Sequence, residues 1–419
     1  MKVVHLNASD KGGASIVAQR LNSALNQYTT VSSRHLIFDA SRTDLSETQV
    51  WANTPLRKWR ALINHALDKF DFLQYERDRT IRFQFNHARV GVDISEHPLI
   101  LDADIIHIHW ILKGFLSFDS LKKLLNLGKP VVWTCHDLWP FTGGCFYLWG
   151  CQQLTKGCGT CPYMIHPETT NSPAFWLEWK KHILGAANIH WASPSKWLAE
   201  IAKTSPVMRQ NTHISIIPNP IKVSDFEVSN LLEKQKIREN IGLKADVFTV
   251  VFSAANLENP AKGFPDFLAL VERLKSYELQ VIVMGKSNTA FNLPVPFYNA
   301  GYISDVRKVR ALTSAADLYI TTSQEDNLPT TVMESLACGV PALGYEIGGV
   351  PELISHDSTG YVYPSGAWHL MAEGVIKLIE EPQLLAEFSA NARIKAETLY
   401  DEAKVSQQYA ELYHSILLK

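Results

Sequence analysis

Short apolar strands alternate with helical segments along the whole of this 419-residue chain. The strands are apolar on both faces and rich in β-branched residues, as buried parallel strands are. They include 105–110, 130–134, 248–253, 281–284 and 316–322. Helical segments such as 14–26 and 264–275 fall between them. Because parallel strands need crossover helices, this order predicts an α/β fold with doubly wound parallel sheets.

The order of strand, glycine-containing turn and helix occurs twice. The first strand leads into the turn at 10–15, and a second strand from 248 leads into Lys262-Gly263. A polar, charge-mixed stretch at 222–246 separates the halves. We predict two Rossmann-like domains facing a central cleft, an N-terminal domain over 1–222 and a C-terminal domain over 223–394. A helix over about 395–419 could pack back on the first domain.

The bulk properties are those of an ordinary globular protein. The formal net charge of −2 implies no general attraction to nucleic acid. The chain opens directly into a strand, without a signal peptide, and contains no apolar run long enough to span a bilayer. We therefore expect a cytoplasmic protein, in which disulfides are rare.

Two acids lie close together in the second half. Asp326 and Glu334 are eight positions apart, and Glu334 falls in a helix expected to begin after Pro329. Eight residues are a little over two helical turns, so both carboxylates lie near one face. The start of that helix offers free backbone N–H groups and a positive dipole end. Acids that hold sugar hydroxyls beside such a phosphate-binding helix end suggest a nucleotide-sugar pocket.

Three further motifs follow predicted strands, where doubly wound folds bind ligands. Gly12-Gly13 would let the backbone approach a phosphate closely, or would simply make a turn. His136 would face the site, or would be a buried histidine satisfied by Asp137 or by the backbone. Lys262 would add a cation at a helix start, or would be a solvated loop lysine.

These motifs, together with the segments at 337–341 and 348–352, resemble family 4 retaining glycosyltransferases. The resemblance covers essentially the whole chain and is strongest from about 250 to 365. The block at 142–162 resembles a subgroup associated with bacterial exopolysaccharide synthesis of the colanic-acid type. The resemblance implies a GT-B fold, with an acceptor-binding N-terminal domain and a donor-binding C-terminal domain.

The resemblance also implies a role for each matching residue. Lys262 matches the lysine that holds the donor diphosphate, Asp326 the acid that contacts the donor sugar, and Glu334 the acid that holds the ribose. His136 matches the histidine beside the reacting sugar, and Gly13 the glycine near the donor phosphate. We expect His136, Asp326 and Lys262 to be catalytic. The other donor-binding matches are the backbone amides of Asn327 and Leu328, the base-cradling Tyr302 and Ile303, and Asn256.

Two positions depart from the family pattern. The family usually has Glu where this chain has Asp326, so the side chain is one methylene shorter. The family commonly has an arginine where this chain has Asn256, and a neutral amide binds phosphate less well than an arginine fork. Lys286 or Arg307 could compensate for that lost cation.

The reaction implied is transfer of a hexose-type sugar from a nucleoside-diphosphate sugar to a glycan or lipid-linked acceptor, with retention at the anomeric carbon. It would serve bacterial surface or exopolysaccharide synthesis. Asp102-Ala-Asp104 has the letters of a metal-binding motif but precedes a buried strand, so we expect metal-independent catalysis without a catalytic cofactor. Two alternatives remain open: a nucleotide-sugar 2-epimerase of the same fold, and a non-catalytic sugar-nucleotide-binding partner of another transferase.

Four cysteines fall within seventeen residues: Cys145, Cys151, Cys158 and Cys161. Four thiolates suit tetrahedral zinc, and an intracellular setting favours a metal over two disulfides. Such a zinc would be structural, since four protein ligands leave no open position. Cys135 and Cys338 are expected to be small buried residues.

The segment from 55 to 89 combines cations with apolar residues at helical spacing. It contains eight basic residues, Arg82 among them, and four acids. An interfacial helix that contacts anionic lipid has this pattern, and so has an amphipathic helix packed on its own domain. Peripheral contact with the inner face of the cell membrane is therefore a second hypothesis for localisation.

Overall fold

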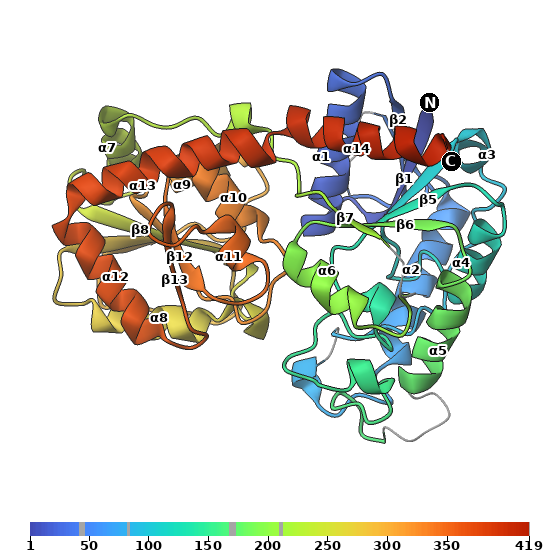
Figure 1. Cartoon of the computed structure of the whole chain (residues 1–419). Helices are drawn as coiled ribbons and strands as arrows, with labels where there is room; N and C mark the ends of the chain where they lie inside the picture. Colours follow the sequence, from blue (N-terminus) through green and yellow to red (C-terminus); the bar gives the residue numbers. More distant parts are fainter. Residues whose placement is uncertain (42–46, 82–83, 167–172, 209–212, 419) are drawn as a thin grey trace. The chain divides into compact units, whose positions relative to one another are not determined.

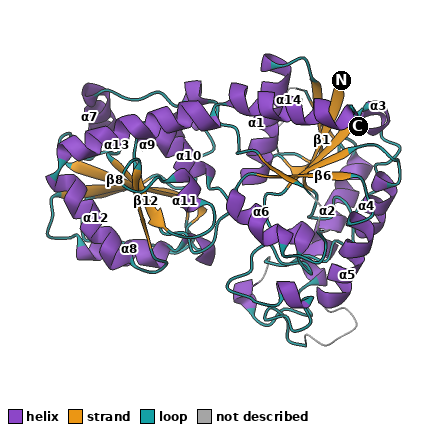
Figure 2. Ribbon diagram, in the orientation of Figure 1, coloured by secondary structure: helices purple, strands orange, loops and turns teal. Residues whose placement is uncertain are grey.

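The structure, a computed structural model, describes residues 1–41, 47–81, 84–166, 173–208 and 213–418. The chain forms two compact units: Met1–Pro218 with Val405–Lys419 (unit 1), and Asn219–Lys404 (unit 2). Each unit is a parallel β-sheet with helices on both faces (Figures 1 and 2). The predicted α/β fold with two Rossmann-like domains is confirmed.

Unit 1 is built on a seven-stranded sheet in the order β3-β2-β1-β4-β5-β6-β7. The strands are β1 (Lys2–Ser9), β2 (Ser32–Asp39), β3 (Thr48–Val50), β4 (Ile105–Trp110), β5 (Val131–Thr134), β6 (Ile189–Ser193) and β7 (Ile214–Ile216). The helices are α1 (Gly13–Tyr28), α2 (Pro55–Asp71), α3 (Pro98–Asp102), α4 (Phe118–Leu125), α5 (Pro173–Leu184), α6 (Lys196–Lys203) and α14 (Glu402–Leu417). Short helical turns are η1 (Arg79–Ile81), η2 (Trp139–Phe141) and η3 (Leu154–Lys156).

Two apolar clusters cover the faces of the unit 1 sheet. On one face, Leu21 and Leu25 of α1 pack with Tyr409 and Tyr413 of α14. On the other face, α4, α5 and α6 contribute to a larger cluster that includes Trp133. The last helix of the chain thereby belongs to the core of the first unit.

Unit 2 is built on a six-stranded sheet in the order β10-β9-β8-β11-β12-β13. The strands are β8 (Phe248–Asn256), β9 (Leu279–Lys286), β10 (Phe297–Asn299), β11 (Leu318–Thr321), β12 (Ala342–Tyr345) and β13 (Gly360–Tyr363). The helices are α7 (Leu231–Asn240), α8 (Phe264–Arg273), α9 (Val306–Ser314), α10 (Thr330–Ala337), α11 (Val350–Leu353), α12 (Trp368–Glu380) and α13 (Pro382–Lys395). The helical turns are η4 (Val223–Asp225), η5 (Pro260–Lys262) and the π-helical η6 (Ala396–Tyr400).

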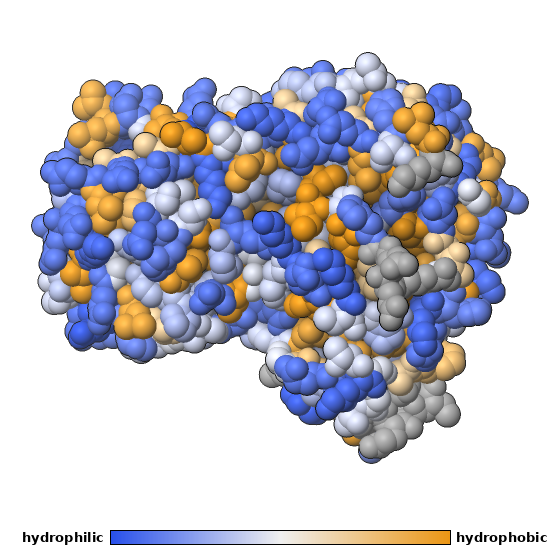
Figure 3. Space-filling view, in the orientation of Figure 1, coloured by the Kyte–Doolittle hydropathy of each residue, from blue (hydrophilic) through white to orange (hydrophobic). Residues whose placement is uncertain are grey.

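Helices α10 and α13 pack on one face of this sheet, and α8 and α12 on the other. In the face drawn in Figure 3, hydrophobic residues are scattered among hydrophilic ones. Among the described residues, no helix is both long and apolar enough to cross a bilayer.

Candidate active site

Two glycines fix the segment that joins β11 to α10. Gly263 has a φ of +62°, and a Cβ there would lie 1.8 Å from the carbonyl oxygen of Thr322. Gly348 has a φ of +54°, and a Cβ there would lie 1.7 Å from the carbonyl oxygen of Asp326. Only glycine permits both the left-handed backbone and these close approaches. The segment is therefore held from two sides, with Asp326 between them.

Asp326 and Lys262 form an ion pair at this segment. The lysine Nζ lies 2.5 Å from the carboxylate Oδ2, and the two side chains are 27% and 12% exposed. Lys262 ends η5, directly before α8, and Asp326 precedes α10. Neither helix has a side-chain hydrogen bond at its N-cap, Gly263 and Pro329. The structure thus brings together a cation, an acid and two helix starts that suit an anion.

Glu334 lies in the second turn of α10 and is partly exposed. The hydroxyl of Tyr319 on β11 donates a hydrogen bond to the Ser253 carbonyl of β8. Burial raises the pKa of Tyr319, and the charges of Glu334 and Asp326 raise it further. The charges of both acids therefore act on one buried phenol.

The remaining donor-binding candidates lie around the same strand ends. Asn256 is exposed at the end of β8, and its register partner in β9 is Lys286. Tyr302 and Ile303 follow β10, and Tyr302 is 59% exposed. Arg307 is paired with its neighbour Asp305 on the surface. Of the two cations that could replace the missing arginine, Lys286 is therefore the one beside Asn256.

Two further members of this segment are buried. Asn327 and Leu328 are 5% exposed, and the Leu328 carbonyl accepts a hydrogen bond from the side chain of Asn219.

Asp102 and Asp104 of unit 1 stand before β4, at the amino end of the strand, and both accept hydrogen bonds from Lys2. They therefore lie at the amino end of β4 in unit 1, whereas His136 and Gly13 follow the carboxyl ends of strands in the same sheet.

In unit 1, His136 and Asp137 directly follow β5, and both are partly exposed. Asp137 accepts hydrogen bonds from the Trp110 indole and from the Trp139 amide, and burial raises its pKa to about 6. His136 is hydrogen-bonded to His109 at 3.0 Å, and burial lowers its pKa to about 4. One hydrogen-bond partner of His136 is thus another imidazole. Gly13 opens α1 after β1, and β4 separates that strand from β5.

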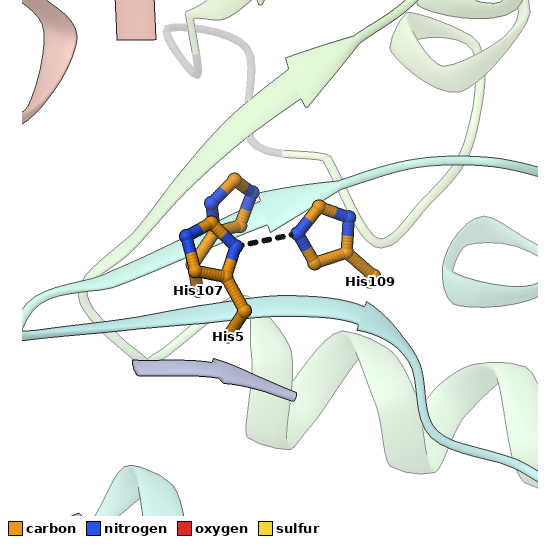
Figure 4. Close-up of side chains that lie close together, drawn as sticks. All are labelled: His5, His107 and His109. Carbon is orange, nitrogen blue, oxygen red and sulfur yellow. Dashed lines mark hydrogen bonds between the residues drawn. The ribbon is translucent and has the colours of Figure 1, made fainter. Parts of the chain in front are cut away.

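A cluster of buried histidines lies beneath His136. In the described chain, His5, His107 and His109 form the one group of three potential metal ligands whose ligand atoms lie within 4.8 Å of one another (Figure 4). The two ring nitrogens of His107 contact the hydroxyls of Tyr413 and Thr134 at 2.6 and 2.7 Å. His5 and His109 are hydrogen-bonded to each other at 2.9 Å. These contacts suit a hydrogen-bond network rather than ligation of a metal.

The four cysteines of the predicted zinc site are free thiols, three of them buried. Burial raises the pKa of Cys145, Cys158 and Cys161, and neighbouring cysteines raise it further. No three of their sulfurs lie within 4.8 Å of one another in the part of the chain that the structure describes. The remaining cysteine of the cluster, Cys151, is partly exposed. Zinc ligation by this cluster stays a prediction.

Sequence reasoning missed the histidine cluster and Lys180. The Nζ of Lys180 is fully buried and donates to the carbonyls of Trp139 and Thr142, at 2.5 and 2.9 Å. The alternation of His107 and His109 in a strand was a signal that both face the same side of the sheet. No comparable signal marked Lys180.

Comparison with known proteins adds to this geometry. A family model described as glycosyl transferases group 1 matches residues 233–395, and one described as Glycosyltransferase Family 4 matches residues 77–225. The "Putative colanic acid biosynthesis glycosyl transferase WcaC" of Escherichia coli is 25% identical over 386 residues, covering 88% of this chain and 87% of that protein. An N,N'-diacetylbacillosaminyl-diphospho-undecaprenol N-acetylgalactosaminyltransferase of Campylobacter jejuni is 25% identical over 37% of this chain and 42% of its own length.

Solved structures match the fold of the whole chain. The crystal structure of Anabaena HepE in complex with UDP-glucose has a TM-score of 0.65 at 17% identity, covering 99% of this chain and 100% of that chain. The sucrose-phosphate synthase of Thermosynechococcus elongatus has a TM-score of 0.69 at 16% identity, covering 100% and 99%. Both domain families and the fold agree, so the chain belongs to the glycosyltransferases of the family 4 and group 1 type, with the GT-B fold.

Proposed function

We propose that this glycosyltransferase moves a hexose-type sugar from a nucleoside-diphosphate sugar to a glycan or lipid-linked acceptor in polysaccharide synthesis, with retention at the anomeric carbon. The observation that carries the proposal is the Lys262–Asp326 pair beside the starts of α8 and α10. A diphosphate would replace the carboxylate as the partner of Lys262. The complex of HepE with UDP-glucose supports a nucleoside-diphosphate sugar as the donor. The similarity to a protein named for colanic acid biosynthesis supports a polysaccharide product.

The catalytic power would come from charge stabilisation. The departing diphosphate gains negative charge, and Lys262 with the helix N–H groups would stabilise it. Glu334 would hold the ribose hydroxyls, and Asp326 would contact the sugar once the phosphate has taken Lys262. His136 would position the reacting sugar. In this scheme the diphosphate accepts the acceptor's proton, and no metal ion is required.

A panel of labelled nucleotide sugars, including UDP-glucose, UDP-galactose and GDP-mannose, tests this scheme. Transfer or donor hydrolysis is expected, whereas epimerisation, or binding without turnover, would favour the other functions considered for this fold. Glu334→Ala should raise the donor KM by about 10-fold or more, since it removes the hydrogen-bonding partner assigned to the ribose hydroxyls. Glu272→Ala is the matched control, because Glu272 is an exposed acid of α8 paired with Lys275.

Retention and metal independence need their own measurements. The anomeric configuration of the product, read by NMR, should equal that of the donor. Turnover should survive treatment with EDTA, and its loss and recovery on addition of Mg²⁺ or Mn²⁺ would overturn metal independence. Unchanged donor binding by Glu334→Ala would overturn the ribose assignment.

We also propose that α2 docks on an anionic membrane surface, which would bring a lipid-linked acceptor to the enzyme. Six large apolar residues of α2 are more than half exposed: Leu56, Trp59, Leu62, Ile63, Leu67 and Phe70. The exposed cations Arg57, Lys58, Arg60 and Lys69 accompany them. Only Ala61 and Asn64 are buried, so this helix is amphipathic without packing its apolar residues on its own domain. Arg82, part of the predicted basic segment, lies outside the described residues.

The acids of α2 face the protein rather than solvent. Asp68 accepts a hydrogen bond from Asn86, and Asp71 is paired with His87 and Arg89. The exposed charge of the helix is therefore basic, and anionic lipid attracts each such cation by about 1 kcal/mol. Changing Arg57, Lys58 and Arg60 to Gln should weaken binding to phosphatidylglycerol vesicles at least tenfold. Gln at the exposed Lys236, Lys275 and Lys308 of unit 2 is the control, and equal binding by both variants would refute the proposal.

The cysteine cluster remains our candidate for structural zinc. Backbone N–H groups already point at its sulfurs: Gln153 at Cys151, Gly143 at Cys158, and Tyr163 and Met164 at Cys161. Such bonds stabilise thiolates, the form that binds metal. Protein purified under reducing conditions should carry about one zinc per chain. Cys161→Ser should lose the zinc and Cys338→Ser should keep it, and wild type without zinc would refute the site.

A further inference from the structure

Three imidazoles form a hydrogen-bonded chain that ends at His136. His136 Nε2 lies 3.0 Å from His109 Nδ1, and His109 Nε2 lies 2.9 Å from His5 Nδ1. The rings come from three neighbouring strands or strand ends: β5, β4 and β1. His5 and His109 are 0% and 2% exposed, and their hydrogen bond is drawn in Figure 4.

The chain allows only two arrangements of its protons. Burial lowers the pKa of all three rings, which keeps them neutral near pH 7. A neutral imidazole has one N–H donor and one lone-pair acceptor. Each ring in the middle of a chain must therefore donate in the same direction as its neighbour. Either every N–H points toward His136, or every N–H points toward His5.

The inner end of the chain selects between the two arrangements. His5 Nε2 is buried and has no hydrogen-bond partner among the residues that the structure describes. An unpaired buried N–H is rarer in proteins than an acceptor with a free lone pair. The Nε2 atom of His5 therefore carries the lone pair, and its proton lies on Nδ1. His5 then donates to His109, and His109 donates to His136.

We propose that His5 and His109 are positioning residues that hold His136 in the tautomer with its proton on Nδ1. This inference rests on the proposed role of His136 beside the donor sugar. In this tautomer Nε2 already accepts a bond from His109, and Nδ1 can only donate. His136 therefore offers a hydrogen-bond donor to a sugar or phosphate oxygen and does not act as a general base. The inner end of the chain is closed, so the chain sets a tautomer and does not conduct protons to solvent.

Nitrogen NMR of protein labelled with ¹⁵N-histidine tests the tautomer directly, because protonated and unprotonated ring nitrogens have well-separated shifts. Assignment uses the loss of the His136 signals in His136→Gln. In wild type, His136 should show a protonated Nδ1 and an unprotonated Nε2. His109→Leu removes both bonds of the middle ring, so His136 should become a mixture of tautomers. His109→Asn keeps a side-chain amide near the position of Nδ1 and should restore the wild-type pattern.

Turnover of the donor found active in the nucleotide-sugar panel gives the second readout. His109→Leu should lower kcat about 10- to 100-fold, as the loss of an orienting partner does elsewhere, with little change in the donor KM. His109→Asn should recover most of that loss, and His5→Leu should fall between them. His35→Leu is the matched control. His35 is equally buried and beside His5, but both of its nitrogens lack partners among the described residues.

Three results would overturn the inference: a protonated Nε2 on His136 in wild type, an unchanged tautomer in His109→Leu, or an equal fall in kcat for His35→Leu. If no donor is turned over, the proposed function fails, while the NMR pattern still decides the tautomer. Urea unfolding of each variant separates loss of folding from loss of positioning.

Discussion

Mild acid should destabilise unit 1 steeply, because desolvation holds at least five of its histidines without charge. Burial places the pKa of His5, His107 and His109 well below the usual value, that of His35 at about 3, and that of His136 at about 4. In the unfolded chain each ring titrates near its ordinary pKa of about 6.5. The unfolded state therefore binds more protons than the native state as the pH falls below that value. Stability is complete above it and is lost with acidification.

The size of the effect follows from proton linkage. Between pH 7.5 and 5.5 each ring costs about 1.4 kcal/mol, so five rings cost about 7 kcal/mol. Burial raises the pKa of Asp68 and Asp137 to about 6, which acts in the opposite direction. Protonation of these two carboxyls stabilises the folded unit by about 1 kcal/mol each, so the free energy of unfolding falls by about 5 kcal/mol in total. A typical domain has only about 5–15 kcal/mol of stability, so unit 1 should be close to unfolding.

Urea unfolding at a series of pH values measures this loss. Ten of the eleven tryptophans belong to unit 1, so tryptophan fluorescence reports mainly on that unit. The slope of unfolding free energy against pH at 5.5 should correspond to uptake of about 3 protons. Ordinary carboxylates take up protons mostly below about pH 4.5, which keeps the two effects apart.

A single variant makes the test specific. His35→Leu should remove about one proton from the uptake and should stabilise unit 1 at pH 7.5 by about 1–3 kcal/mol, because both ring nitrogens of His35 are buried without partners among the described residues. His414→Asn, at an exposed histidine of α14, should change neither quantity. Uptake of fewer than about one proton at pH 5.5 would refute the reasoning, as would an unchanged slope in His35→Leu.

Three further predictions concern single contacts. Asp326→Asn should bind UDP about fivefold more tightly in isothermal titration, because the Lys262–Asp326 ion pair, worth about 1 kcal/mol, no longer competes with the diphosphate for Lys262. The same variant should lose donor turnover. Weaker UDP binding would contradict this. Gly348→Ala should lower the stability of unit 2 by about 1–3 kcal/mol, through backbone strain and the clash with the Asp326 carbonyl, and unchanged urea unfolding would exclude such a clash. Lys180→Met should lower the stability of unit 1 by about 2 kcal/mol at neutral pH, since two carbonyls lose their donor, and a gain in stability would show that the buried amine is the greater cost.

The sequence alone determined the fold class and the neighbourhood of the candidate site. Strands that are apolar on both faces require helices on both sides of a parallel sheet, and such sheets carry their functional residues at the carboxyl ends of the strands. The helix after Pro329 and the acid spacing of Asp326 and Glu334 are local features, so the sequence could place them.

Only the tertiary structure decided which side chains meet. Lys262 and Asp326 are 64 positions apart, and their pairing depends on β8 and β11 being neighbours in the sheet. His5 and His109 are 104 positions apart and meet because β1 lies beside β4. The alternation of a strand specifies which residues share a face, but strand order is set by packing of the whole sheet. The sequence therefore named His136, and the fold supplied the two buried rings behind it.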